Sequence, residues 1–137
     1  MWKLQEYLSI LVIILPLVAE VAGNSTLGGN ELILTKQDNG KEITVKPGDI
    51  IQIELKAHGS AGYMWEFDNL DNEYFELFKK ETKVINQEKG FTGAPALEIW
   101  QLRTKKQGES EIKLHHYRVW EGKEKAIDTF NIKVKIL

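Results

Sequence analysis

Residues 51–56 read Ile51-Gln52-Ile53-Glu54-Leu55-Lys56, and this stretch decides the fold class. Apolar side chains alternate strictly with polar ones, which is the period of a β-strand that has one buried face and one solvated face. The end of the chain repeats the pattern, with polar residues separating Phe130, Ile132, Val134 and Ile136. Two such stretches in a short chain predict a sheet protein with an apolar core.

Other short extended segments surround these two, and turn residues separate them. The segments are expected at 31–35, 43–45, 63–67, 74–85, 97–104 and 112–118. Asp38-Asn39-Gly40 and Pro47-Gly48-Asp49 are strong turn signals. Outside the N-terminal region, no segment keeps a helical period over the length of an ordinary helix. The pattern predicts an antiparallel, immunoglobulin-like β-sandwich of seven to eight strands.

Composition excludes several classes of function. The 137 residues carry a net charge of −2, whereas a general nucleic-acid binder has a strong basic excess. Cysteine is absent, which excludes disulfides, thiolate metal sites and cysteine nucleophiles. No cofactor and no metal are expected, and the domain is expected to be a monomer.

The N-terminal region has the order of a secretory signal peptide. Lys3 precedes an almost purely apolar run at 8–18, and small residues follow up to Gly23. We therefore expect a signal peptide at 1–23, a short flexible N-terminus at 24–29 and the domain at 30–137. The run is shorter than the ~20 residues of a spanning helix. The alternative is a retained anchor that holds the domain on the outer side of a membrane. Asn24-Ser25-Thr26 is a glycosylation acceptor pattern.

The loops divide into two chemically different sets. Connections in an antiparallel sandwich alternate between its two ends, so loops 58–62, 85–96 and 119–125 should share one end. The turns of the opposite end are generic, but the three loops contain Phe91 and Trp120, which no turn requires. This asymmetry favours a recognition surface, and the alternative is that these two side chains fold back to cap the core.

Three motifs in these loops carry a family resemblance. The first reads His58-Gly59-Ser60-Ala61-Gly62-Tyr63-Met64-Trp65, the second Gly90-Phe91-Thr92-Gly93-Ala94-Pro95 with Trp100 downstream, and the third Arg118-Val119-Trp120. In order and spacing they resemble the loops of the chagasin family, inhibitors of papain-like cysteine peptidases. The resemblance covers residues 30–137. The first loop lacks the Asn-Pro-Thr part of the family motif, and Val119 replaces the proline of the family's Arg-Pro-Trp.

The resemblance implies a reversible inhibitor that places three loops in the cleft of a papain-like cysteine peptidase. No residue would be catalytic. The residues expected to bind the peptidase are Gly59, Ser60, Ala61, Gly62, Tyr63, Gly90, Phe91, Thr92, Gly93, Arg118, Val119 and Trp120.

Elementary chemistry suits these roles. Glycine lacks Cβ, so the backbone of the first loop can approach another chain closely, and Ser60 and Ala61 fit a narrow cleft. Trp120 is the kind of large rigid side chain that dominates binding energy, and Phe91 is a second candidate anchor. Two roles stay open for Arg118: it donates hydrogen bonds to the target, or it holds its own loop by bonding to backbone carbonyls.

The sequence bears on three other classes of function. A hydrolase built on His58 and Ser60 is disfavoured, because Gly59-Ser60-Ala61-Gly62 lacks the nucleophile-elbow form. A metal site at His115 and His116 is disfavoured because neighbours on a strand point to opposite faces. The remaining alternative is an exported adhesion or carbohydrate-binding sandwich, which would share the fold and the exposed aromatic residues.

Overall fold

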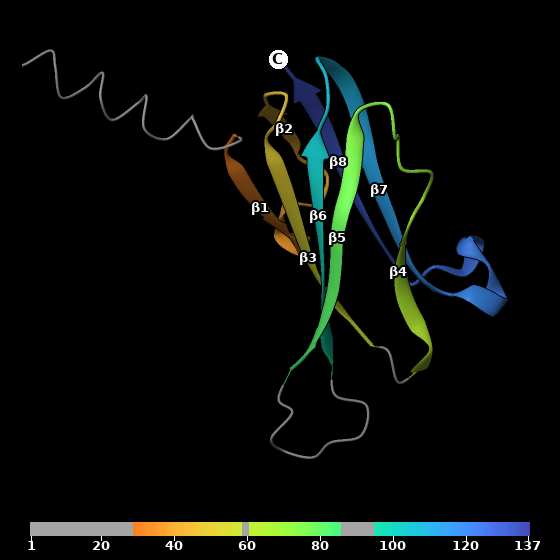
Figure 1. Ribbon diagram of the computed structural model, residues 1–137. Helices are drawn as coiled ribbons and strands as arrows, with labels where there is room; N and C mark the ends of the chain where they lie inside the picture. Colours follow the sequence, from red (N-terminus) through yellow and green to blue (C-terminus); the bar gives the residue numbers. More distant parts are fainter. Residues whose placement is uncertain (1–28, 59–60, 86–94) are drawn as a thin grey trace, which may run out of the picture. The chain divides into compact units, whose positions relative to one another are not determined.

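The strands of the domain form two four-stranded sheets (Figure 1). The computed structural model describes residues 29–58, 61–85 and 95–137, and the compact unit within them spans Glu31–Leu137. One sheet has the order β1-β3-β6-β5 and the other β2-β8-β7-β4. The strands are β1 (Glu31–Thr35), β2 (Glu42–Val45), β3 (Ile50–Ala57), β4 (Tyr63–Phe67), β5 (Phe75–Val84), β6 (Ala96–Thr104), β7 (Gly108–Arg118) and β8 (Asp128–Ile136). Short 3-10 turns include η1 (Lys36–Asp38), η4 (Val119–Glu121) and η5 (Lys123–Lys125).

The predicted sandwich of eight strands is confirmed, but the prediction that it is antiparallel is wrong at two edges. Strand β1 runs parallel to β3, and β2 runs parallel to β8. The reason lies in the path of the chain, because β2 follows β1 in sequence but belongs to the other sheet. Two reversals of direction, at η1 and again before β3, bring the chain back to the first sheet in its original direction.

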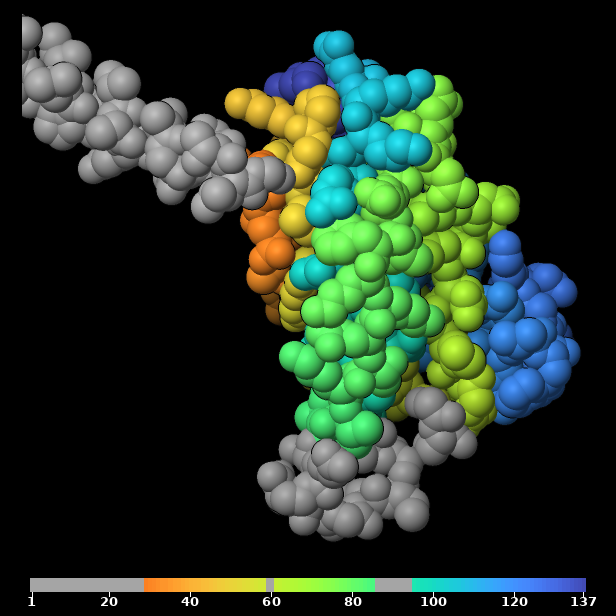
Figure 2. Space-filling model, in the orientation of Figure 1, coloured from red at the N-terminus to blue at the C-terminus, as the bar shows by residue number. Residues whose placement is uncertain are grey.

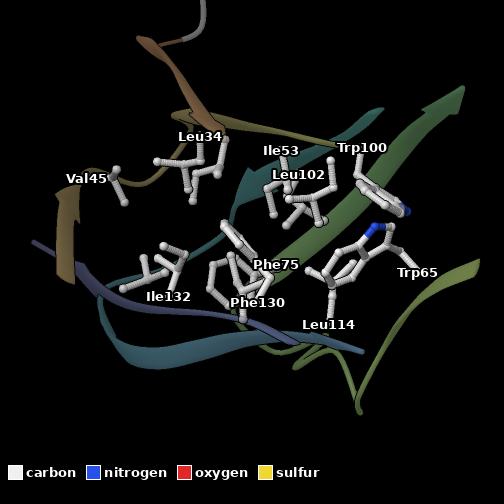
Figure 3. Packing of buried hydrophobic residues seen from close by; sticks show 14 of the residues in the cluster. Leu34, Val45, Ile53, Trp65, Phe75, Trp100, Leu102, Leu114, Phe130 and Ile132 are labelled. Carbon is white, nitrogen blue, oxygen red and sulfur yellow. The ribbon is translucent and has the colours of Figure 1, made fainter. Parts of the chain in front are cut away.

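The core lies between the two sheets and is made of the apolar side chains that alternate along the strands. The inward residues of β3 and β8 are buried, as predicted, and Trp65, Phe75 and Trp100 pack among them (Figure 3). Burying one such side chain contributes roughly 1.5–3 kcal/mol. The prediction that Trp65 and Trp100 are core residues is therefore confirmed.

One end of the sandwich is closed by Trp65. Its indole Nε1 donates a hydrogen bond of 2.9 Å to the backbone carbonyl of Lys56, and this bond joins β4 in one sheet to β3 in the other. Its backbone N–H donates to the buried carboxylate of Glu98 at 3.4 Å. Burial raises the pKa of Glu98 above its ordinary value. The first loop, which connects β3 to β4, thus starts from a fixed base.

The predictions for residues 1–28, including the signal peptide and glycosylation at Asn24, lie outside the described residues. Within the ranges that are described, no helix has the length and apolar character needed to span a membrane.

Candidate functional site

The strands that flank the three loops begin or end at the same end of the sandwich (Figure 1). In the first sheet, Ala96 at the start of β6 pairs with Ala57 at the end of β3 and with Val84 at the end of β5. In the second sheet, Tyr63 at the start of β4 pairs with Arg118 at the end of β7. The predicted grouping of the loops is therefore confirmed for their flanking strands. Six of the predicted contact residues lie outside the described residues: Gly59, Ser60, Gly90, Phe91, Thr92 and Gly93.

The third loop presents its apolar side chains to solvent. Residues 119–121 form the turn η4, in which Trp120 is 71% exposed and Val119 is 60% exposed. The loop stands out from the body of the sandwich (Figure 2). The alternative that Trp120 folds back to cap the core is therefore wrong. An exposed tryptophan in a fixed turn is available to a partner protein.

The indole of Trp120 lies against the backbone of the first loop at Gly62. This glycine has a φ of +83°, and a Cβ built on it would lie 2.2 Å from Cη2 of Trp120. Both the left-handed backbone and the close contact require a residue without a side chain. The first and third loops thus meet at one point, and Ala61 beside it is exposed.

Arg118 holds its own loop through a side chain that the sequence reasoning missed. Its Nε and Nη2 donate to the two carboxylate oxygens of Glu121 at 2.9 and 2.7 Å. The guanidinium carbon lies 4.8 Å from the ring centroid of Tyr63 and 5.7 Å from that of Trp120. This hydrogen bonding lowers the pKa of Glu121 and raises that of Arg118. Arg118 thus holds its loop through a carboxylate and not through backbone carbonyls. The signal available in the sequence was a glutamate three residues after the arginine.

His116 connects Tyr63, over which Arg118 lies, to the buried ring of Trp65. Its ring stacks on Trp65 with centroids 4.7 Å apart and an angle of 8° between the planes. Tyr63 approaches its edge at 5.7 Å, and His58 stacks on it at 6.2 Å. From Trp65 to Trp120, contacts therefore run without a break through His116, Tyr63 and Arg118. We call these five side chains the ring column.

Two of the histidines are neighbours on β7 and lie on different faces of the sheet. As predicted, His115 and His116 face opposite sides of the sheet, because His116 is 4% exposed and lines the core while His115 lies on the outer face near Asp68. In the described parts of the chain, no three His, Cys, Asp or Glu residues are grouped as a metal ion would require.

We expect His116 to make the stability of the domain depend on pH. Burial, and then the neighbouring His58, lower the pKa of His116 below its ordinary value of 6.5, while Asp128 opposes the shift. Below about pH 6.5 the unfolded chain takes up a proton that folded His116 excludes, so the free energy of unfolding falls as the pH falls. Replacing His116 by phenylalanine keeps an aromatic ring at this position but removes the titrating group. The urea concentration at the unfolding midpoint should then change less between about pH 7 and 5 than it does in the parent protein.

The matched control is His115→Phe, on the opposite face of the same strand. This variant should keep the pH dependence of the parent protein, since it leaves the stack on Trp65 intact. Parallel pH profiles for the parent protein and His116→Phe would show that His116 does not cause the dependence.

Comparison with known proteins places the chain in a family. The family described as "Chagasin family peptidase inhibitor I42" matches residues 44–134. Amoebiasin-2 of Entamoeba histolytica is 32% identical over 93 residues, which cover 67% of this chain and 75% of that protein. Chagasin of Trypanosoma cruzi is 26% identical over 104 residues, which cover 74% of this chain and 94% of chagasin.

The fold agrees with this assignment. The crystal structure of the cysteine protease inhibitor EhICP2 from Entamoeba histolytica superposes with a TM-score of 0.71 at 27% identity, covering 79% of this chain and 96% of that one. The matched region includes all three loop motifs and the whole ring column. The chain therefore belongs to the chagasin family of peptidase inhibitors.

Proposed function

We propose that this protein reversibly inhibits papain-like cysteine peptidases by inserting the three loops at one end of the sandwich into the active cleft. The observation that carries the proposal is Trp120, a largely exposed tryptophan held in place against Gly62 at the loop end of a chagasin-family domain. The family is one of inhibitors, so the chain is not an enzyme.

Inhibition of this kind needs occlusion and no chemistry. Exposed Ala61 and the bare backbone of Gly62 offer a narrow tip, and Trp120 offers a broad apolar surface beside it. Tyr63 is half-buried under Arg118 and supports the tip from behind. The second loop lies largely outside the described residues, and its sequence, with glycines at 90 and 93 and Phe91 between them, is the basis for including it in the proposal.

The direct test is a titration of the purified protein against papain and several cathepsin L-type peptidases. Competitive, reversible inhibition is expected, with activity regained after dilution. No inhibition of any of these enzymes at micromolar concentration would refute the proposal, and would favour an adhesion or carbohydrate-binding role for the same surface.

A bulky side chain at position 61 tests whether the first loop enters the cleft. Ala61 is exposed, so Ala61→Trp should leave the domain folded. The added ring should clash with the walls of a narrow cleft and weaken inhibition by about 10-fold or more, since misfit of a large side chain costs about 1–3 kcal/mol. An unchanged inhibition constant would place this loop outside the cleft.

We also propose that residues 1–23 direct export and that the domain acts outside the cytoplasm. The support is the apolar run at 8–18, followed by small residues up to Gly23. Mass spectrometry of the protein from its native source would reveal a new N-terminus at Asn24 if the segment is cleaved, and an intact N-terminus if it is retained as an anchor.

A further inference from the structure

Glu121 lies outside the Arg118-Val119-Trp120 motif, yet it determines how that motif is held. Its carboxylate accepts both hydrogen bonds that Arg118 donates within the loop. Both side chains are only about a third exposed or less, at 31% for Arg118 and 26% for Glu121. A paired, two-bond contact between a guanidinium and a carboxylate fixes the plane of the guanidinium as well as its position.

The orientation of Arg118 matters because its guanidinium lies near two aromatic rings. The guanidinium lies over the ring of Tyr63 and also near the ring of Trp120. Such contacts depend on the position of the cation relative to the ring. A guanidinium released from Glu121 would regain its freedom of rotation, and Trp120 would lose one of the neighbours that define its position.

Lys123 ties the far end of the loop to Asp68 through a hydrogen bond of 2.8 Å, but η4 at its start is less constrained. Turn η4 is three residues long, and no side chain caps its start at Arg118. Val119 stands where the Arg-Pro-Trp form of the motif has a proline, which would fix φ through its ring. An ion pair that spans the turn from Arg118 to Glu121 supplies a comparable restraint through side chains.

We propose that Glu121 is a positioning residue of the inhibitor, which clamps Arg118 and thereby presents Trp120 to the peptidase in its bound orientation. This inference rests on the proposed function. Ordering one flexible side chain in advance of binding contributes about 0.5–1.5 kcal/mol, so loss of the clamp should weaken inhibition by about 3- to 10-fold. The pKa of Glu121 is held below its ordinary value by Arg118, so the clamp stays ionised at mildly acidic pH.

A double-mutant cycle separates positioning from direct contact. Inhibition constants are measured for the parent protein, Glu121→Gln, Arg118→Ala and the double variant. If Glu121 acts through Arg118, Glu121→Gln should weaken inhibition in the parent protein and have no further effect beside Arg118→Ala. Additive losses would show that Glu121 contacts the peptidase itself and would overturn the inference. Glu124→Gln removes the same charge from the same loop, where Glu124 is exposed, and should leave inhibition unchanged.

A second readout needs no peptidase. In the free protein, an NMR cross-peak is expected between the indole protons of Trp120 and the α-protons of Gly62, because these groups are in contact. The cross-peak should weaken in Glu121→Gln and persist in Glu124→Gln. Equal intensity in all three proteins would overturn the inference. If the parent protein inhibits no peptidase, the proposed function fails, and this measurement still decides whether Glu121 positions Trp120.

Discussion

Replacing Trp120 by alanine should weaken inhibition of a papain-like peptidase by about 30-fold or more, while the folding transition changes little. Truncating a tryptophan anchor at an interface typically costs about 2 kcal/mol or more. Trp120 is 71% exposed in the free domain, so its removal creates no cavity in the core. Surface substitutions of this kind usually change stability by about 0.5 kcal/mol or less. Inhibition constants and urea-unfolding curves for the same preparations measure both effects.

Ile127 provides the matched control for this substitution. It is also an exposed apolar residue in the connection between β7 and β8, but it lies outside the loop motifs. Ile127→Ala should therefore leave the inhibition constant close to that of the parent protein. If Trp120→Ala unfolds the domain, or if both variants inhibit as well as the parent, Trp120 is not the anchor.

Gly62→Ala should lower both stability and inhibition, because two separate costs fall on one methyl group. The left-handed backbone, with φ +83°, costs a residue with a Cβ about 1–2 kcal/mol. The new Cβ would also lie 2.2 Å from Cη2 of Trp120, so the indole must move. Because removing Trp120 altogether should change stability by about 0.5 kcal/mol or less, moving its exposed indole aside adds at most about that much to the loss of stability. A total loss of about 1–2.5 kcal/mol in the free energy of unfolding is expected, and inhibition should weaken because the indole is displaced.

Gly40 separates the two costs. Its φ is +84°, almost equal to that of Gly62, but a Cβ built on it meets nothing within 4 Å. Gly40→Ala should therefore show the backbone cost alone and leave inhibition unchanged. In a Trp120→Ala background, Gly62→Ala should become as mild as Gly40→Ala. A Gly62→Ala variant that matches Gly40→Ala in both stability and inhibition while Trp120 is present would show that the indole does not rest on Gly62.

The alternation of apolar and polar residues predicted part of the fold, because it specifies the two faces of each strand. The period of two in β3 and β8 specifies which side chains face the core, and their burial confirms it. It carries no information on the direction of a neighbouring strand. The parallel edges at β1 and β2 depend on a chain path that switches sheets twice, so they could not be derived from the pattern.

The sequence predicted the exposed residues of the candidate site but not the residues that hold them in position. A tryptophan that no turn requires was visible in the sequence, and its exposure confirms that it is not part of the core. The contact of His116 with Trp65 depends on the register of β4 against β7, which local sequence does not specify. The role of Glu121 could have been predicted from the sequence, because a carboxylate three residues after an arginine can reach back across a single turn.

The ring column, which joins buried Trp65 to exposed Trp120, has a consequence for laboratory evolution of this inhibitor. A selection for new target peptidases would ordinarily randomise the exposed loops and leave the interior constant. Here the interior side chains of Trp65 and His116 stack on each other, and His116 contacts Tyr63, over which Arg118 lies. We expect libraries that also vary these two positions among aromatic side chains to alter how Trp120 is presented while every exposed residue stays the same.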